Sequence, residues 1–206
     1  ASSTASADGA TALGAESVAS GESSTAIGLG ATASEIGATA TGEGAQSTGA
    51  YATATGSESV ASNTQATATG FRSEASGLAS TTVGGYSAAT GDFASAFGYG
   101  ATASGSGATA VGESAEASGE ESTAVGGTSF FGLITTQATG AGASAFGNGA
   151  WATGDLSTAL GYNSYAREEN STALGSNAFA LAANSLAQGA DSRAERENTV
   201  SVGDVG

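Results

Sequence analysis

The chain has 206 residues and a mass of 19.2 kDa, with 34 glycines and no proline, cysteine, methionine or histidine. Four arginines against 19 acidic residues give a formal charge of -15, which argues against binding to nucleic-acid phosphates or anionic lipid surfaces. Without histidine and cysteine, the chain cannot form a His-based catalytic triad, a thiol nucleophile, a disulfide or the usual zinc sites. It contains no run of about 18 apolar residues, so we expect no direct membrane contact.

A glycine that ends a Thr-Ala-Leu-Gly-like tetrapeptide recurs with a fourteen-residue period from Gly14 to Gly203. The one longer step, of one and a half periods, lies between Gly126 and Gly147. The chain therefore holds fourteen copies in register. A fixed short period over a whole chain predicts a solenoid, in which each repeat packs on its neighbours. We expect a single all-β domain over residues 1–206, a parallel β-roll (β-solenoid) of about fourteen coils.

Each copy contains two short segments in which small and larger residues alternate. The first is typified by residues 11–14 and 25–28, and the second, seven residues later, by residues 18–21 and 32–34. Side chains that follow one another along a strand point to opposite faces, and the central residue of both segments is almost always alanine. We expect the alanines to line a flat interior and the glycines to form the turns, where a positive φ or a close backbone approach is needed.

In the first segment, the residue just before the glycine points outward and is apolar in ten of the fourteen copies. These residues are Leu13, Ile27, Val83, Phe97, Val111, Val125, Phe146, Leu160, Leu174 and Val202. Soluble monomers rarely leave such a continuous apolar column in water. We therefore predict that the ten residues form the interface of an oligomer.

The same outward column holds threonine in three copies, Thr39-Ala-Thr41, Thr53-Ala-Thr55 and Thr67-Ala-Thr69. Threonine pairs on a flat solenoid face resemble those of ice-binding β-solenoids, which gives an alternative function. The column becomes apolar on both sides of the three copies. This favours threonines buried at an interface between chains.

We assign the seven extra residues of the long step to Phe-Phe-Gly-Leu-Ile-Thr-Thr at 130–136. Seven residues are half a coil and would exchange the two faces of every later copy, yet the later copies stay in phase, so we expect this segment to loop out. In the next copies, Trp151, Tyr165 and Phe179 take the outward position of the second segment. Either Phe130, Phe131, Leu133 and Ile134 cover this aromatic row as a small satellite core, or all seven side chains form an exposed ligand platform.

Two further features bear on catalysis and metal binding. Glu120-Glu121 and Glu168-Glu169 are paired carboxylates of the kind used in acid–base catalysis, but a solenoid corner offers no concave pocket for a substrate. Gly84-Gly85 and Gly126-Gly127 lack the following Gly-x-Asp pattern of calcium-binding β-rolls. We predict that the protein is not an enzyme and has no metal and no cofactor.

The octapeptides Ser-Thr-Ala-Ile-Gly-x-x-Ala at 24–31 and Ser-Thr-Ala-Leu-Gly-x-x-Ser at 157–164 resemble the head repeats of trimeric autotransporter adhesins of the YadA type. The family motif often reads Asn-Ser-Val-Ala-Ile-Gly. Where the family has Ser-Val-Ala, this chain usually has Ser/Ala-Thr-Ala. The resemblance covers essentially the whole chain, and residues 198–206 look like the run into the family's neck. It implies a left-handed roll and a homotrimer around a threefold axis.

The resemblance also implies a function. In that family the head mediates attachment to host extracellular matrix proteins (collagen, fibronectin or laminin) or to host cells, which is a virulence function. It further implies export to the cell surface and anchoring at the outer membrane by a C-terminal segment. We expect this chain to be a fragment of such a longer protein.

Overall fold

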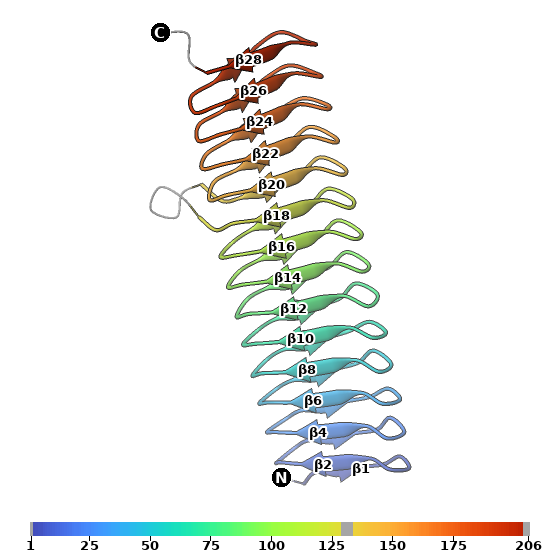
Figure 1. Cartoon of the computed structure of the whole chain (residues 1–206). Helices are drawn as coiled ribbons and strands as arrows, with labels where there is room; N and C mark the ends of the chain where they lie inside the picture. The colour runs from blue at the N-terminus through green and yellow to red at the C-terminus, as the bar shows by residue number, and fades with distance from the viewer. Residues whose placement is uncertain (1, 129–133, 204–206) are drawn as a thin grey trace. The chain divides into compact units, whose positions relative to one another are not determined.

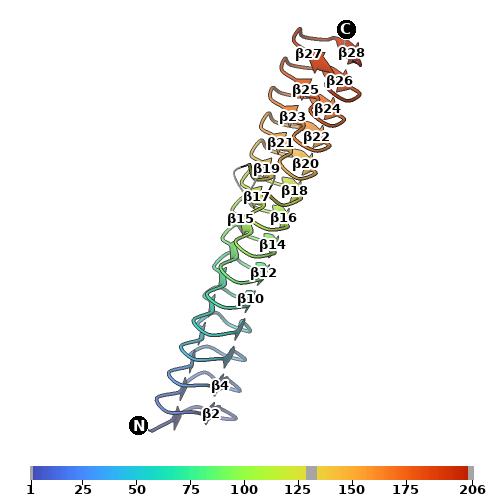
Figure 2. The same ribbon diagram turned by 90° about the vertical axis from the view of Figure 1, so that its left-hand side faces the viewer.

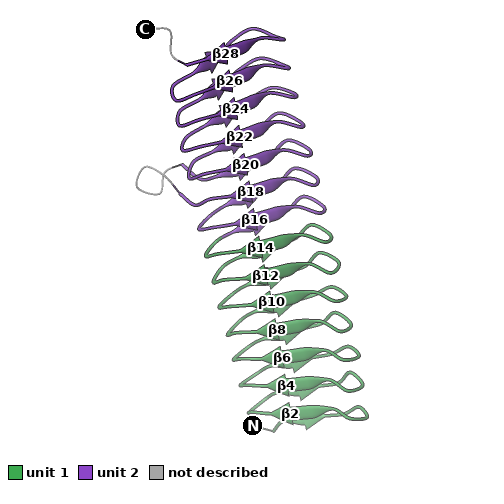
Figure 3. Ribbon diagram, viewed as in Figure 1, with its two compact units in different colours: residues 1–100 green, residues 101–206 purple. Residues whose placement is uncertain are grey.

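The structure is a computed structural model that describes residues 2–128 and 134–203. The chain forms two compact units, residues 1–100 and 101–206, which are described separately (Figure 3). Every regular element in the described residues is a β-strand, and each unit contains seven coils of two strands. In this part of the chain no helix has the length and apolarity needed to cross a membrane. The expected β-roll of about fourteen coils is confirmed, whereas the single domain over residues 1–206 stays a prediction.

The strands of the first unit are β1 (Thr4–Ala5), β2 (Thr11–Leu13), β3 (Val18–Ala19), β4 (Thr25–Ile27), β5 (Thr32–Ala33), β6 (Thr39–Thr41), β7 (Gln46–Ser47), β8 (Thr53–Thr55), β9 (Val60–Ala61), β10 (Thr67–Thr69), β11 (Glu74–Ala75), β12 (Thr81–Val83), β13 (Ala88–Ala89) and β14 (Ser95–Phe97). The strands of the second unit are β15 (Thr102–Ala103), β16 (Thr109–Val111), β17 (Glu116–Ala117), β18 (Thr123–Val125), β19 (Gln137–Ala138), β20 (Ser144–Phe146), β21 (Trp151–Ala152), β22 (Thr158–Leu160), β23 (Tyr165–Ala166), β24 (Thr172–Leu174), β25 (Phe179–Ala180), β26 (Leu186–Gln188), β27 (Arg193–Ala194) and β28 (Val200–Val202).

Within each unit the two strands of a coil belong to two different parallel sheets. The odd-numbered strands form one sheet and the even-numbered strands the other, in chain order (Figure 1). Figure 2 shows this separation in the second unit, where the labels β15 to β27 follow one side and β18 to β28 the other. Each strand pairs with the strand one coil later, so every outward position forms a column along its sheet.

The pairing register carries the sequence period into the structure. Thr25 pairs with Thr39 and Ile27 with Thr41, so each residue lies beside the one that follows it by a full period. At the long step the paired residues are one and a half periods apart. Glu116 pairs with Gln137 in one sheet, and the strands of the other sheet are offset by the same amount. The coils on both sides of the step therefore present the same faces.

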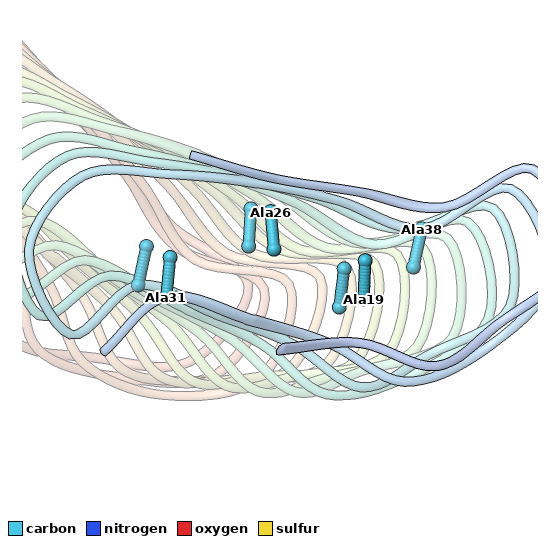
Figure 4. Packing of buried hydrophobic residues seen from close by; sticks show 7 residues of the cluster. Ala19, Ala26, Ala31 and Ala38 are labelled. Atoms are coloured by element: carbon cyan, nitrogen blue, oxygen red, sulfur yellow. The ribbon is translucent and has the colours of Figure 1, made fainter. Parts of the chain in front are cut away.

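The interior contains small side chains from both sheets. Ala19 and Ala26 lie on opposite sheets and are fully buried, as are the corner residues Ala31 and Ala38. Figure 4 shows these four side chains directed into the narrow space between the two layers of backbone. Only alanine, serine and threonine side chains are fully buried among the described residues, which confirms the predicted flat interior.

The turns combine a positive φ with a hydrogen bond across four residues. The Ser17 N–H donates to the Gly14 carbonyl at 3.4 Å and the Ser24 N–H to the Gly21 carbonyl at 3.1 Å. The third residue of each of these turns has a positive φ, 60° at Glu16 and 56° at Ser23. A positive φ at this position is typical of a type II turn. We expected glycine to provide the positive φ, and the structure shows that many non-glycine residues also adopt it.

Buried corner serines fall into two groups. Ser59 Oγ donates to the Gly56 carbonyl at 2.8 Å, whereas Ser24, Ser122 and Ser157 have no hydrogen-bond partner among the described residues. A buried hydroxyl without a partner costs about 1–3 kcal/mol. Alanine is the residue at the same corner in neighbouring coils, for example at Ala38.

We therefore expect that Ser24→Ala, Ser122→Ala and Ser157→Ala, made singly, each raise the melting temperature, by a gain of about 1 kcal/mol. The matched control Ser59→Ala removes a bonded hydroxyl and should lower the melting temperature. Thermal unfolding followed by circular dichroism measures both effects. If all four substitutions shifted the transition in the same direction, hydrogen bonding would not distinguish the two groups.

Candidate functional site

The first candidate surface is the outward column on the even-numbered strands. In the first unit Leu13 pairs with Ile27, and Val83 pairs with Phe97. These side chains point away from the interior, and all four are exposed, from 37% at Ile27 to 65% at Leu13. The predicted outward orientation is confirmed, whereas their burial between chains stays a prediction.

The second unit presents the same column on β16 to β28. Val111 pairs with Val125, which pairs with Phe146, and the column continues through Leu160 and Leu174 in the next two coils. Val111 and Val125 are half-buried, whereas Phe146, Leu160 and Leu174 are 37–45% exposed. Val202, which is 72% exposed, ends the column on β28.

This face of the even-numbered sheets carries no charge. Among the described strands, every outward residue of the even-numbered ones is threonine, serine, glutamine or an apolar residue. Charged side chains lie instead on the odd-numbered strands, at Glu74, Glu116 and Arg193. In a chain with a formal charge of -15, such a charge-free face is a marked asymmetry.

The threonine pairs lie in register on this same face. Thr39 and Thr41 pair with Thr53 and Thr55, which pair with the next two threonines on β10. Ile27 precedes Thr41 in the column, and Val83 follows the last threonine. The flat threonine surface is thus three coils long, with apolar residues at each end.

The second candidate surface is the aromatic row on the odd-numbered sheet of the second unit. Trp151, Tyr165 and Phe179 pair in sequence on β21, β23 and β25. The Trp151 and Tyr165 rings meet edge to face, with centroids 5.7 Å apart and planes at 90°. The Trp151 indole N–H donates to the Thr135 carbonyl at 2.7 Å, and this hydrogen bond holds the ring against the backbone at Thr135.

The structure corrects one boundary of the predicted insertion, residues 130–136. Thr136 is fully buried, and its carbonyl accepts the Glu116 N–H at 2.9 Å, as the corner residues of other coils do. Its hydroxyl lies 2.8 Å from the Gly147 carbonyl oxygen. Thr136 therefore belongs to the coil and not to the insertion.

Of the predicted platform residues, Ile134, Trp151, Tyr165 and Phe179 line one hollow of about 230 Å³. Phe130, Phe131 and Leu133 lie outside the described residues. The hollow is also lined by Gly149, Asn163, Ser164 and Asn177.

An acidic hollow in the second unit was not expected. Glu120, Glu121, Asp155 and Glu169 line a depression of about 410 Å³ at one set of turns. The prediction that the paired carboxylates face no concave surface is therefore wrong for Glu120, Glu121 and Glu169. Asp155 is engaged with the backbone, because its carboxylate accepts the Ala141 N–H at 2.9 Å. No group of three acidic side chains in the described part of the chain is arranged to hold a metal ion.

Sequence reasoning also missed an exposed aromatic cluster in the first unit. Phe71 and Tyr86 meet edge to face at 5.3 Å, and Tyr86 and Tyr99 at 5.5 Å, all on the turns after the even-numbered strands. The Arg72 guanidinium lies 5.0 Å from the Phe71 ring centroid and bonds to Glu58 at 2.6 Å. The hydrogen bond and negative charge of Glu58 raise the pKa of Arg72 above its ordinary value.

The fold and these surfaces can be compared with known proteins. The model of the YadA head domain repeat, which spans two copies, matches ten segments, some of them overlapping, that together cover most of the chain. They are residues 1–17, 5–31, 19–45, 33–59, 47–73, 75–101, 103–129, 138–155, 152–178 and 180–204. The chain belongs to the YadA head family.

Among solved structures, the collagen-binding domain of the Yersinia adhesin YadA is 27% identical to this YadA-like head. The match covers 76% of this chain and 68% of that chain, with a TM-score of 0.40. No curated protein matches the chain.

Membership identifies the chain as a YadA-like head domain of a trimeric autotransporter adhesin, a part of such proteins that is exposed at the cell surface. It supports a role in adhesion and does not favour the ice-binding alternative. The family is in general non-enzymatic.

Proposed function

We propose that this YadA-like head forms a homotrimer that attaches the bacterial cell to host extracellular matrix or to host cells. The observation that carries the assembly is the apolar, charge-free column on the even-numbered strands. Its ten apolar residues are those predicted from the sequence, Leu13, Ile27, Val83, Phe97, Val111, Val125, Phe146, Leu160, Leu174 and Val202.

The small interior makes this column important for stability. A coil buries only alanine, serine and threonine side chains, which each remove little apolar area from water. Burying one outward valine, leucine or phenylalanine per coil adds about 1.5–3 kcal/mol. Three chains around one axis give every copy of the column the same surroundings.

The distribution of charge supports the same assembly. Three chains of charge -15 repel one another, so an interface forms most easily where no carboxylate has to be buried. The outward face of the even-numbered sheets meets this requirement. The odd-numbered sheets, with Glu74 and Glu116, would then face solvent and the host.

Adhesion by such a surface gains strength from repetition, because many weak contacts on one cell act together. Collagen, fibronectin and laminin are the matrix proteins that we propose as targets, together with the host cell surface itself. The head would be exported and held at the outer membrane by a C-terminal segment of the full-length protein.

Attachment of the purified head to coated surfaces tests this function. Beads carrying the protein at high density should bind at least one of collagen, fibronectin, laminin or cultured epithelial cells, in a saturable way, and should not bind albumin. Beads carrying the Val111→Asp/Val125→Asp variant, which we expect not to trimerise, provide the matched control. Equal binding to albumin and to every matrix surface would contradict specific adhesion.

A further inference from the structure

The hollow beside the aromatic row is lined mainly by rings. Ile134, Trp151, Tyr165 and Phe179 contribute its apolar lining, and the three aromatic residues are half-buried. The Trp151 and Tyr165 rings lie at 90° to each other and therefore form a corner. The hydrogen bond to the Thr135 carbonyl holds the indole in place before any ligand binds. A preformed apolar hollow of about 230 Å³ is at the small end of ligand sites.

The polar side chains of the lining already have partners within the chain. The Asn177 side-chain amide donates to the Asp191 carboxylate at 3.2 Å, and the Ser164 hydroxyl donates to the Gly161 carbonyl at 3.0 Å. Asn163 likewise has an interaction partner. A ligand rich in hydroxyl or N–H groups would find few free partners here, and burying such groups unpaired costs free energy. The lining therefore favours a group that needs no hydrogen bonds.

The charges near the hollow favour a cation. Asp191 is exposed next to the lining, and none of the four arginines, all of which the structure describes, forms an ion pair with it. Arg167 and Arg193 are instead paired with Glu168 at 3.3 Å and Glu195 at 3.0 Å. One unpaired carboxylate therefore lies beside the hollow. The formal charge of -15 also attracts cations and repels anions.

The aromatic row already contacts one cation of the chain itself. The Arg193 guanidinium lies 5.2 Å from the Phe179 ring centroid. A cation within about 6 Å of a ring centroid is attracted by the negative charge of the ring face, most strongly at tryptophan. In the described part of the chain no guanidinium lies over the rings of Trp151 or Tyr165. This corner is thus the part of the row that remains open to a ligand.

We propose that the corner of Trp151 and Tyr165 binds a quaternary ammonium group of the kind carried by choline. Its positive charge is spread over methyl groups that fit against ring faces, and it has no N–H group that requires an acceptor. A primary ammonium or a guanidinium would bury N–H donors without partners. The family model leaves residues 130–137 unmatched, so Ile134 of the lining lies outside the shared repeat. The inference is independent of the proposed trimer and of its matrix targets.

Trp151 is the only tryptophan, so its fluorescence reports on the hollow directly. Choline chloride should shift its emission in a saturable way, with half-saturation at about 1 mM, whereas sodium chloride at the same ionic strength should not. Dimethylbutanol, the uncharged tert-butyl analogue of choline, should bind about tenfold more weakly. Ethanolamine should also bind more weakly than choline because it carries N–H donors. Phosphocholine should do so because Asp191 and the net charge repel its phosphate.

Three variants keep the test specific. Tyr165→Leu keeps an apolar side chain but removes the ring, so it should weaken choline binding about tenfold and leave dimethylbutanol binding unchanged. Asp191→Asn removes the charge but keeps an oxygen that accepts the Asn177 hydrogen bond, and should weaken choline binding about threefold. Tyr86→Ala, in the aromatic cluster of the first unit, is the matched control and should leave binding unchanged. Circular dichroism confirms that each variant is folded.

The proposal is overturned if choline does not shift Trp151 emission, or if dimethylbutanol binds as tightly as choline, because the hollow would then take any apolar group. Equal effects of Tyr165→Leu and Tyr86→Ala would overturn it too, as would tighter binding of phosphocholine than of choline. If choline binds only to a Phe130→Ser/Phe131→Ser variant, the chain's own side chains fill the hollow and the proposal fails.

The outcome is separable from the adhesion test. If choline fails while protein-coated beads still attach to matrix or cells, the quaternary ammonium site is wrong and the adhesion function stands. If choline binds and the beads attach to nothing, the adhesion function fails and the site stands.

Discussion

Replacing both Val111 and Val125 by aspartate is expected to dissociate the homotrimer. The two valines are neighbours in the outward column and half-buried already within one chain. In three chains the change places about six carboxylates near one axis, where unpaired buried charges cost several kcal/mol each. Analytical ultracentrifugation should show the loss of the trimer, and circular dichroism a lower melting temperature.

The matched control places the same two charges on the opposite sheet. Ser104 and Ser118 follow β15 and β17, in the same coils as the two valines, and Ser104 is exposed. Ser104→Asp/Ser118→Asp should remain trimeric, because both positions lie on the side of the roll that the proposed trimer leaves in solvent. A valine variant that stayed trimeric with an unchanged melting temperature would show that the interface lies on another face.

The second large effect is expected from Gly42→Ala. Gly42 has a φ of 135°, and a Cβ added there would lie 2.5 Å from the carbonyl oxygen of Gly56 in the next coil. Residues with a side chain rarely adopt this backbone conformation. The atom that the added Cβ would meet belongs to the backbone of the next coil, which cannot move without breaking the hydrogen bonds between coils. We expect a loss of about 3 kcal/mol or more, and a fall in melting temperature of about 10 °C.

Gly44→Ala is the control for this substitution, two residues along the same turn. Its φ is 63°, and the nearest atom to an added Cβ is the Glu58 Cγ at 3.8 Å. Glu58 and Arg72 occupy the same turn position in the next coils, with φ values of 56° and 53°. Gly44→Ala should therefore change stability by less than about 1 kcal/mol. Equal losses for the two variants would mean that the close approach at Gly42 is not what requires glycine.

The strands could be predicted from the sequence because small residues recur at two fixed positions in every copy. Ala19 and Ala26 are seven residues apart, and the alternation around each decides which neighbours point outward. The glycines keep the same phase on both sides of the long step. Glu116 and Gln137 therefore occupy equivalent positions in successive copies, and they are neighbours in one sheet.

The boundary of the insertion could not be decided by the same reasoning. Ser129 and Thr136 are seven residues apart, and both are small hydroxylated residues that suit a buried corner. The pattern is satisfied by either residue. The structure distinguishes them through the contacts of Thr136 with the Glu116 N–H and the Gly147 carbonyl.

The surfaces that were missed lie on turns, where residue types follow no strict period. Phe71 and Tyr99 are the first residues after their glycines, whereas Tyr86 is the second, so the cluster has no constant spacing in the sequence. The aromatic row on β21, β23 and β25 was predictable because its members are one full period apart on consecutive strands of one sheet.

The mass of the unmodified chain in solution is the most direct test of the proposed assembly. Sedimentation equilibrium at several concentrations should give one species of three times 19.2 kDa, because the proposed trimer buries the column of ten outward apolar residues. A stable species of 19.2 kDa over the same range would contradict the trimer and leave the apolar column without a partner.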